Sequence, residues 1–195
     1  MRDKPDRIID LGAGTGKLTR LLGQIGAREL IAIEPVPAMR EKLQKTSFIT
    51  KIIDGTAEHI PFDDSTVDMI ICGQSFHWFA NHRTLIECNR VLKSNGLLVL
   101  IWNLQDTRER KWVDDISQYV DSFRSRDTPR YKTMEWKNVF DNQGLFSELQ
   151  YKQFSYQHRL THDIAVNRIL STSFIAALSF EQQKQLVDQV RKMLD

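Results

Sequence analysis

The chain has few cysteines and no long apolar run, and these absences exclude several classes of protein. Only Cys72 and Cys88 occur among 195 residues, too few for a disulfide framework and without C-x-x-C spacing. The longest apolar runs, such as residues 97–102, are far shorter than the ~20 residues that cross a bilayer. The first residues resemble neither a signal peptide nor a transit segment. We therefore expect a cytoplasmic protein without a membrane partner.

The chain also has no large excess of positive or negative charge. The chain carries 27 basic and 25 acidic residues, and a net charge of +2 does not predict a nucleic-acid partner. The histidines have no metal-ligand spacing such as H-E-x-x-H, so no metal site is expected. A hydrophobic fraction of 41% is ordinary for a globular protein with a sizeable core. Charge therefore does not identify the partner, and the sequence leaves open whether the chain forms an oligomer.

Short apolar runs alternate with helical periodicity over residues 7–103. Nearly continuous apolar runs predict strands, which we place at 7–11, 30–33, 48–53, 67–72 and 97–102. Helical spacing lies between several of them, at residues 18–25, 37–43 and 85–92. This alternation predicts an α/β fold, a Rossmann-like doubly wound and mostly parallel sheet with helices on both faces.

The pattern changes after residue 103. Residues 112, 116, 119 and 123 are apolar or aromatic at helical spacing and predict the first helix of a C-terminal cap. Residues 149–160 alternate enough to predict a long strand. Thr161 can cap a short helix through residue 170, and Ser179 with Gln182 forms a capping box before the last helix.

A glycine turn, DLGAGTG at residues 10–16, lies between the first predicted strand and helix. Glycine lets the backbone turn sharply and approach a ligand closely, although a purely structural turn would need the same residues. A dinucleotide turn of the form G-x-G-x-x-G would place its third glycine at position 17, which is Lys. The spacing therefore disfavours a nicotinamide cofactor.

Two acidic residues flank this turn. Glu34 ends the second strand, 22 positions after Gly12, where a carboxylate can accept hydrogen bonds from both ribose hydroxyls; a solvated carboxylate is the alternative. Asp10 ends an otherwise apolar strand, so its carboxylate needs donors or a cation. Local backbone N–H groups could supply the donors, or the α-amino group of a ligand could supply the cation.

Four motifs in order carry a family resemblance: IIDLGAGTGKLTRLL, AIEP, GTAEHIPFDDSTVDMIIC and ECNRVLKSNGLLVLIWN. Together they resemble the class I methyltransferases that depend on S-adenosyl-L-methionine. The resemblance implies a single domain over 1–195, with a cofactor-binding half at 7–103 and a substrate or cap half at 104–195. It implies that the cofactor contacts Asp10, Gly12, Ala13, Gly14, Gly16, Glu34, Pro35, Met39, Asp54, Thr56, Ala57, Glu58, Gln74 and Ser75.

The resemblance also assigns parts of the cofactor to these residues. Asp10 and the turn backbone would face the methionine portion, Glu34 the ribose, and Pro35 with Met39 the adenine. Thr56 stands where the family commonly has an Asp that binds the adenine amino group. Adenine recognition would therefore depend on the Ala57 backbone and on Asp54.

The segment QSFHWF at residues 74–79 follows the fourth strand and is expected to line the reaction centre. SFHWF, and STSF at 171–174, resemble a small-molecule branch that includes trans-aconitate methyltransferase-like proteins. Aromatic faces suit a sulfonium cation, although core packing is an alternative for these rings. His77 is the catalytic candidate, as a general base or as a hydrogen-bond donor. The expected substrate residues are Phe76, His77, Trp78, Trp102 and Asn103, and arginines at 108, 110, 124 and 130 either bind an acidic substrate or form a solvated face.

We therefore expect methyl transfer to a small-molecule oxygen, of a carboxylate or a hydroxyl, with nitrogen a weaker option. A catalytically inactive cofactor-binding module, or a truncated relative, is the alternative, because N-terminal lid helices and a last strand are not readable in the sequence. An NAD-dependent oxidoreductase is the third hypothesis.

Overall fold

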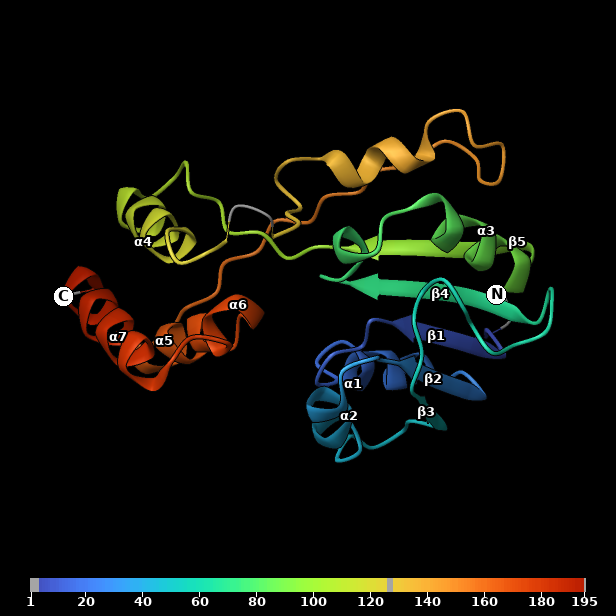
Figure 1. The fold of residues 1–195 in the computed structure, drawn as a ribbon, viewed down its shortest axis with the longest axis horizontal. Helices are drawn as coiled ribbons and strands as arrows, with labels where there is room; N and C mark the ends of the chain where they lie inside the picture. Colours follow the sequence, from blue (N-terminus) through green and yellow to red (C-terminus); the bar gives the residue numbers. More distant parts are fainter. Residues whose placement is uncertain (1–3, 126–127, 195) are drawn as a thin grey trace. The chain divides into compact units, whose positions relative to one another are not determined.

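The apolar runs of the first hundred residues form a parallel sheet in the computed structural model, which describes residues 4–125 and 128–194 (Figure 1). The strands are β1 (Arg7–Leu11), β2 (Glu29–Ile33), β3 (Lys51–Ile53), β4 (Val67–Gly73) and β5 (Leu92–Ile101). Their order is β3-β2-β1-β4-β5, and every pair is parallel. The order reverses between β1 and β4, which is where open α/β sheets bind ligands.

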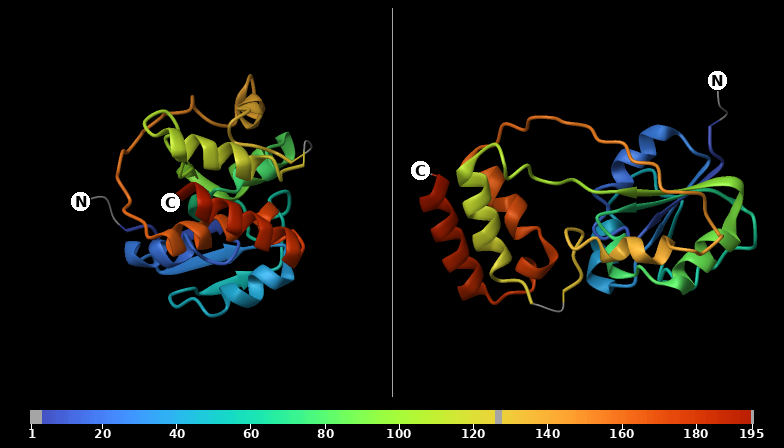
Figure 2. Two further views of the ribbon diagram at one scale, coloured as in Figure 1. Left: turned by 90° about the vertical axis from the view of Figure 1, so that its left-hand side faces the viewer. Right: turned by 90° about the horizontal axis from the view of Figure 1, so that it is seen from above.

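Alternate residues of β1 and β2 pack on opposite faces of the sheet. Ile9 and Ile31 belong to a core that α3 (His82–Val91) and the 3-10 helix η3 (Glu135–Phe140) cover, whereas Ile8 and Leu30 pack with α1 (Thr19–Leu22). Figure 2 shows α1 on one side of the sheet and α3 with η3 on the other. A short 3-10 helix, η1 (Gly23–Ile25), extends α1, and α2 (Pro37–Leu43) packs through Leu43 against Ala32. Helices on both faces confirm the doubly wound α/β prediction.

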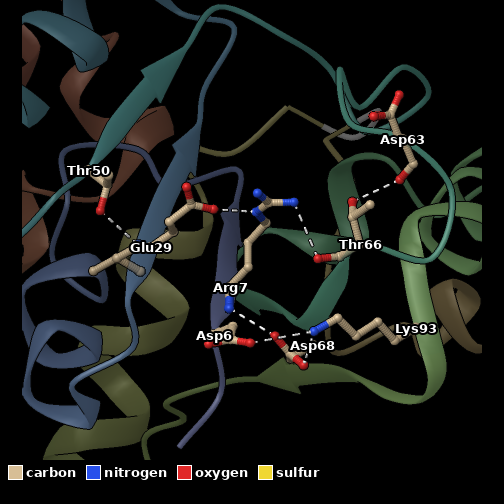
Figure 3. A network of polar contacts seen from close by, with 9 residues as sticks. Asp6, Arg7, Glu29, Thr50, Asp63, Thr66, Asp68 and Lys93 are labelled. Atoms are coloured by element: carbon tan, nitrogen blue, oxygen red, sulfur yellow. Dashed lines mark hydrogen bonds and ion pairs between the residues drawn. The ribbon is translucent and has the colours of Figure 1, made fainter.

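An ion-pair network joins the strands at their amino ends (Figure 3). The Arg7 side chain donates to the Glu29 carboxylate and to the Thr66 carbonyl, and its backbone N–H donates to Asp68. Lys93 pairs with the same Asp68 carboxylate at 2.8 Å. The network connects β1, β2, β4 and β5 at their amino ends, whereas the glycine turn lies at the carboxyl ends of the strands.

The chain divides into two compact units. The first comprises Met1–Asn103 and Pro129–Leu149, and the second Leu104–Thr128 and Gln150–Asp195. Residues 129–149, which the sequence places in the C-terminal half, therefore belong to the unit that contains the sheet.

The described residues of the second unit form the helices α4 (Lys111–Asp121), α5 (His162–Leu170), α6 (Ser173–Ala176) and α7 (Phe180–Leu194). Their core consists of Ile116, Val166, Ile175, Leu186 and Val190. The Thr161 hydroxyl accepts the Ile164 N–H, and Ser179 and Gln182 exchange reciprocal hydrogen bonds, which confirms both predicted helix caps.

Three local predictions are wrong. Residues 149–160 form no strand, because no neighbouring strand supplies hydrogen bonds, and Tyr151, Phe154 and Tyr156 are exposed. The third strand begins at Lys51 rather than at residue 48, since Phe48 is exposed with a φ of +71°. The helix predicted over residues 85–92 ends at Val91, and β5 begins at Leu92, well before the strand predicted to begin at residue 97.

In the described part of the chain, no strand follows β5. None of the helices in these residues has the length and the apolar character that crossing a membrane requires.

Candidate functional site

The glycine turn connects the carboxyl end of β1 to α1. The N–H groups of Gly12 and Ala13 both donate to the carbonyl of Ile33, which ties the turn to the end of β2. Gly12 and Gly14 have φ values of +71° and +59°, the left-handed region that favours glycine. The local sequence therefore adopts the sharp turn that its glycines predict.

The three glycines of the turn face different surroundings. A Cβ at Gly12 would lie 2.8 Å from the Cβ of Ser75, and one at Gly16 would lie 2.7 Å from Leu43. A Cβ at Gly14 would meet only the sulfur of Met39, at 3.9 Å. Gly12 and Gly16 are thus required by packing, whereas a Cβ at Gly14 would make only an ordinary van der Waals contact.

Glu34 connects the turn to the carboxyl end of β2. One carboxylate oxygen accepts the Gly14 N–H at 2.8 Å, and the other accepts the Val36 N–H at 2.9 Å. The residue is 5% exposed. Each carboxylate oxygen has a second lone-pair site, so Glu34 can also accept hydrogen bonds from two hydroxyl groups.

Asp10 lies behind the turn and is almost fully buried. Its Oδ2 accepts a hydrogen bond from the Thr19 hydroxyl at 2.6 Å, and within the described residues its Oδ1 has no partner. Burial raises the pKa of Asp10 to about 6; the Thr19 hydrogen bond opposes this rise and the charge of Glu34 adds to it. An unpartnered buried carboxylate oxygen is suited to a cationic donor from a ligand.

Arg40, on α2, was not identified by the sequence reasoning. Its guanidinium donates to the carbonyl oxygen of Glu34 at 2.8 Å and to the carboxylate of Asp54 at 2.7 Å. Glu34 follows β2 and Asp54 follows β3, so no local sequence motif predicts that Arg40 contacts both. One carboxylate oxygen of Asp54, an expected adenine contact, is therefore held by Arg40.

The residues after β3 have partners within their own loop and at the N-cap of α3. Thr56 forms an isolated antiparallel bridge with His59, and Ala57 is buried. The Glu58 carboxylate accepts a hydrogen bond from the Asn81 side chain at 2.8 Å. Desolvation opposes ionisation of Glu58, but hydrogen bonds, chiefly from Asn81, hold its pKa below the ordinary value. The sequence-predicted adenine contacts of these residues remain predictions, and so do those of the exposed Pro35 and of Met39.

Gln74 and Ser75 join the carboxyl ends of three strands. The Gln74 side chain donates to the Asn103 carbonyl at 2.9 Å, and the Ser75 hydroxyl donates to the Leu11 carbonyl at 2.8 Å. Gln74 itself has a φ of +59°. The segment after β4 is thereby held beside the turn after β1 and beside the end of β5.

The aromatic residues after β4 separate into core and surface. Phe76 is fully buried and packs against Phe79, Phe140 and Trp136 with ring centroids 5.6–6.3 Å apart. Phe76 is therefore a residue of the hydrophobic core, the alternative to the predicted substrate contact, and its side chain has no exposed surface. Trp78, in contrast, is 48% exposed.

His77 lies in η2 (Phe76–Trp78) and contacts Trp102 at the end of β5. The indole N–H of Trp102 donates to Nδ1 of His77 at 3.3 Å. The Trp102 ring packs against Tyr131 and Trp136, with centroids 4.6 and 4.5 Å away. Sequence reasoning missed these two aromatic residues, because their 129–149 segment was assigned to the cap; the spacing of aromatics at 131, 136 and 140 was the available signal.

Arg108 and Arg124, in the second unit, each pair with a nearby aspartate. Arg108 pairs with Asp106 at 2.9 Å. Arg124 pairs with Asp121 at 3.3 Å, and its guanidinium lies 3.9 Å from the ring centroid of Phe174. Across residues 4–125 and 128–194, no group of three or more His, Cys, Asp or Glu side chains is placed to hold a metal ion.

Comparisons with known proteins agree with this arrangement. Residues 9–100 match the methyltransferase domain family. The chain is 34% identical over 195 residues to the uncharacterized methyltransferase-like protein C25B8.10 of Schizosaccharomyces pombe, an alignment that covers 98% of this chain and 75% of the relative. It is 32% identical over 188 residues to the uncharacterized methyltransferase Rv3342 of Mycobacterium tuberculosis, covering 96% of this chain and 73% of that protein.

The fold is also similar to a crystal structure from Anabaena variabilis, assigned as a methyltransferase of an antibiotic biosynthesis pathway. The TM-score is 0.72 at 21% identity, over 98% of this chain and 80% of the other. With this sheet, this glycine turn and these relatives, the chain belongs to the class I S-adenosylmethionine-dependent methyltransferases.

Proposed function

We propose that the chain methylates a carboxylate oxygen of a small molecule, with S-adenosylmethionine bound at the carboxyl ends of β1 and β2. When bound, the cofactor would supply a methyl group on a sulfonium sulfur; an acceptor oxygen that bonds to the methyl carbon would break the carbon–sulfur bond and displace S-adenosylhomocysteine as a neutral thioether. The resemblance of residues 75–79 to trans-aconitate methyltransferase-like proteins supports the same acceptor class.

Three observations support this cofactor site. The packing around Gly14 leaves room for a Cβ, with the Met39 sulfur 3.9 Å away. The carboxylate of Glu34 keeps acceptor capacity for the ribose hydroxyls. The unpartnered Oδ1 of Asp10 is suited to the cofactor ammonium, and ionisation of Asp10 becomes more favourable beside that positive charge.

The hydrogen bond between Trp102 and His77 supports a carboxylate, rather than a hydroxyl, as the methyl acceptor. An indole N–H can only donate, so Nδ1 of His77 must accept, and a neutral imidazole then carries its proton on Nε2. In this tautomer Nε2 donates a hydrogen bond and cannot remove a proton. A carboxylate is already ionised at neutral pH and needs no base, whereas a hydroxyl acceptor does.

The experiment is a methyl-transfer assay of the purified chain against matched acceptors. Small carboxylic acids are compared with the corresponding alcohols and amines, and S-adenosylhomocysteine and the methylated product are quantified by mass spectrometry. We expect methyl esters, formed at a rate that changes little between pH 6 and 8. Methylation of alcohols alone, with a rate that falls about tenfold per pH unit on the acidic side, would show that His77 acts as a base. Turnover of no acceptor by a chain that binds the cofactor would support the inactive-module alternative.

A further inference from the structure

We propose that Arg40 is a positioning residue for the cofactor. Its guanidinium, held by Asp54, orients Glu34 and thereby sets the affinity for the nucleoside part of the ligand. This inference rests on the proposed placement of the ribose at Glu34.

The contacts of Arg40 join the carboxyl ends of two strands. One nitrogen donates to the carbonyl oxygen of Glu34 at 2.8 Å, and another donates to the carboxylate of Asp54 at 2.7 Å. The Arg40 side chain is 17% exposed, whereas that of Asp54 is 70% exposed. The arginine is thus largely enclosed, and its acidic partner restrains it from the solvent side.

Glu34 needs this support because it lies just beyond the β2–β3 ladder. The last paired residues of that ladder are Ile33 and Ile53, and the N–H of Glu34 still donates to the Ile53 carbonyl. The Glu34 carbonyl is held by Arg40, while its carboxylate is held by Gly14 and Val36. Loss of the arginine removes one of the restraints on the peptide from which the carboxylate projects.

The same contacts give Asp54 a different task from the one that the family resemblance implies. Its carboxylate restrains Arg40, and Arg40 restrains Glu34, so Asp54 acts on ribose recognition through two neighbours. Replacement of Asp54 should therefore weaken nucleoside binding in the same direction as replacement of Arg40, but less. The double variant should be no weaker than the Arg40 variant, because both changes interrupt one chain of contacts.

The experiment compares Arg40→Met with Lys42→Met in the full chain. Both residues are basic positions in the last turn of α2, and Lys42 is exposed, so the control removes an equal charge without these hydrogen bonds. Isothermal titration measures the Kd for S-adenosylhomocysteine and for adenosine, and the methyl-transfer assay measures KM for S-adenosylmethionine and kcat. For Arg40→Met we expect each Kd and the KM to rise on the order of tenfold, with kcat at saturation within about twofold of wild type. Lys42→Met should bind as the wild type does.

Two further variants separate the possible failures. Glu34→Ala should lose most of the affinity for adenosine. If Glu34→Ala binds normally, the cofactor placement is wrong; if only Arg40→Met binds normally, the placement stands and the role of Arg40 is overturned. Should Arg40→Met not fold, Asp54→Ala tests the same contact from the exposed side. An unchanged Kd in that variant, or a fall in kcat without a rise in KM, contradicts the proposal.

Discussion

Asp10→Asn should change how the stability of the protein depends on pH. Asp10 is 1% exposed, and its pKa is raised from 3.8 to about 6, chiefly by desolvation. The folded state therefore prefers the neutral carboxyl. Asn resembles that neutral form in size and does not titrate, so the variant removes the titration while it keeps the shape of the side chain.

The magnitude follows from the difference between the two pKa values. A shift of about two units at ~1.4 kcal/mol per unit corresponds to about 3 kcal/mol. Because the folded-state pKa is the higher one, the stabilising contribution of Asp10 is fully present below pH 3.8. It is lost as the pH rises through 6, and the loss is complete above about pH 7.

Urea denaturation followed by tryptophan fluorescence, at pH values from 4 to 8, measures this effect. The free energy of unfolding of Asp10→Asn, minus that of the wild type, should increase by about 2.5 kcal/mol across the range, because the unfolded carboxyl is already partly ionised at pH 4, and become constant above pH 7. A constant offset from an unsatisfied amide N–H would shift all points equally and leave the increase visible. A difference that does not vary with pH would refute the reasoning.

Three further results are expected. S-adenosylhomocysteine should bind about tenfold more weakly at pH 5 than at pH 8, because its ammonium group favours the ionised form of Asp10. Calorimetry at both pH values measures the affinity of the wild type and of Asp10→Asn. The affinity of the variant should not depend on pH. Gly14→Val should abolish cofactor binding in a folded protein, because its Cβ meets no close neighbour in the fold and the backbone strain is only about 1–2 kcal/mol. Gly12→Ala meets Ser75 and should lower Tm further. Undiminished affinity in folded Gly14→Val contradicts our cofactor placement. Trp102→Phe removes the indole N–H that donates to His77. The NMR signals of the His77 ring should then report a changed mixture of tautomers. An unaltered spectrum would show that this hydrogen bond does not select the tautomer.

Much of the sheet and the turn is determined by local sequence. Strand β1 occupies the predicted residues 7–11, and α2 occupies 37–43, because each depends on its own side-chain periodicity and end signals. The methyltransferase assignment also came from the sequence, since the motifs around Gly14 and Glu34 are contiguous stretches at fixed spacing. The two helix caps of the second unit are local for the same reason.

Contacts between distant residues were decided only by the tertiary structure. Residues 149–160 have the alternation of a strand but form none, because a strand also needs a neighbour with free hydrogen-bonding groups. Arg40 reaches Asp54, and Trp102 reaches His77, only after the strands that precede them in the chain are aligned in the sheet. Periodicity and motifs describe how each segment folds by itself, whereas burial, the raised pKa of Asp10 and the choice of hydrogen-bond partners depend on which segments the fold brings together.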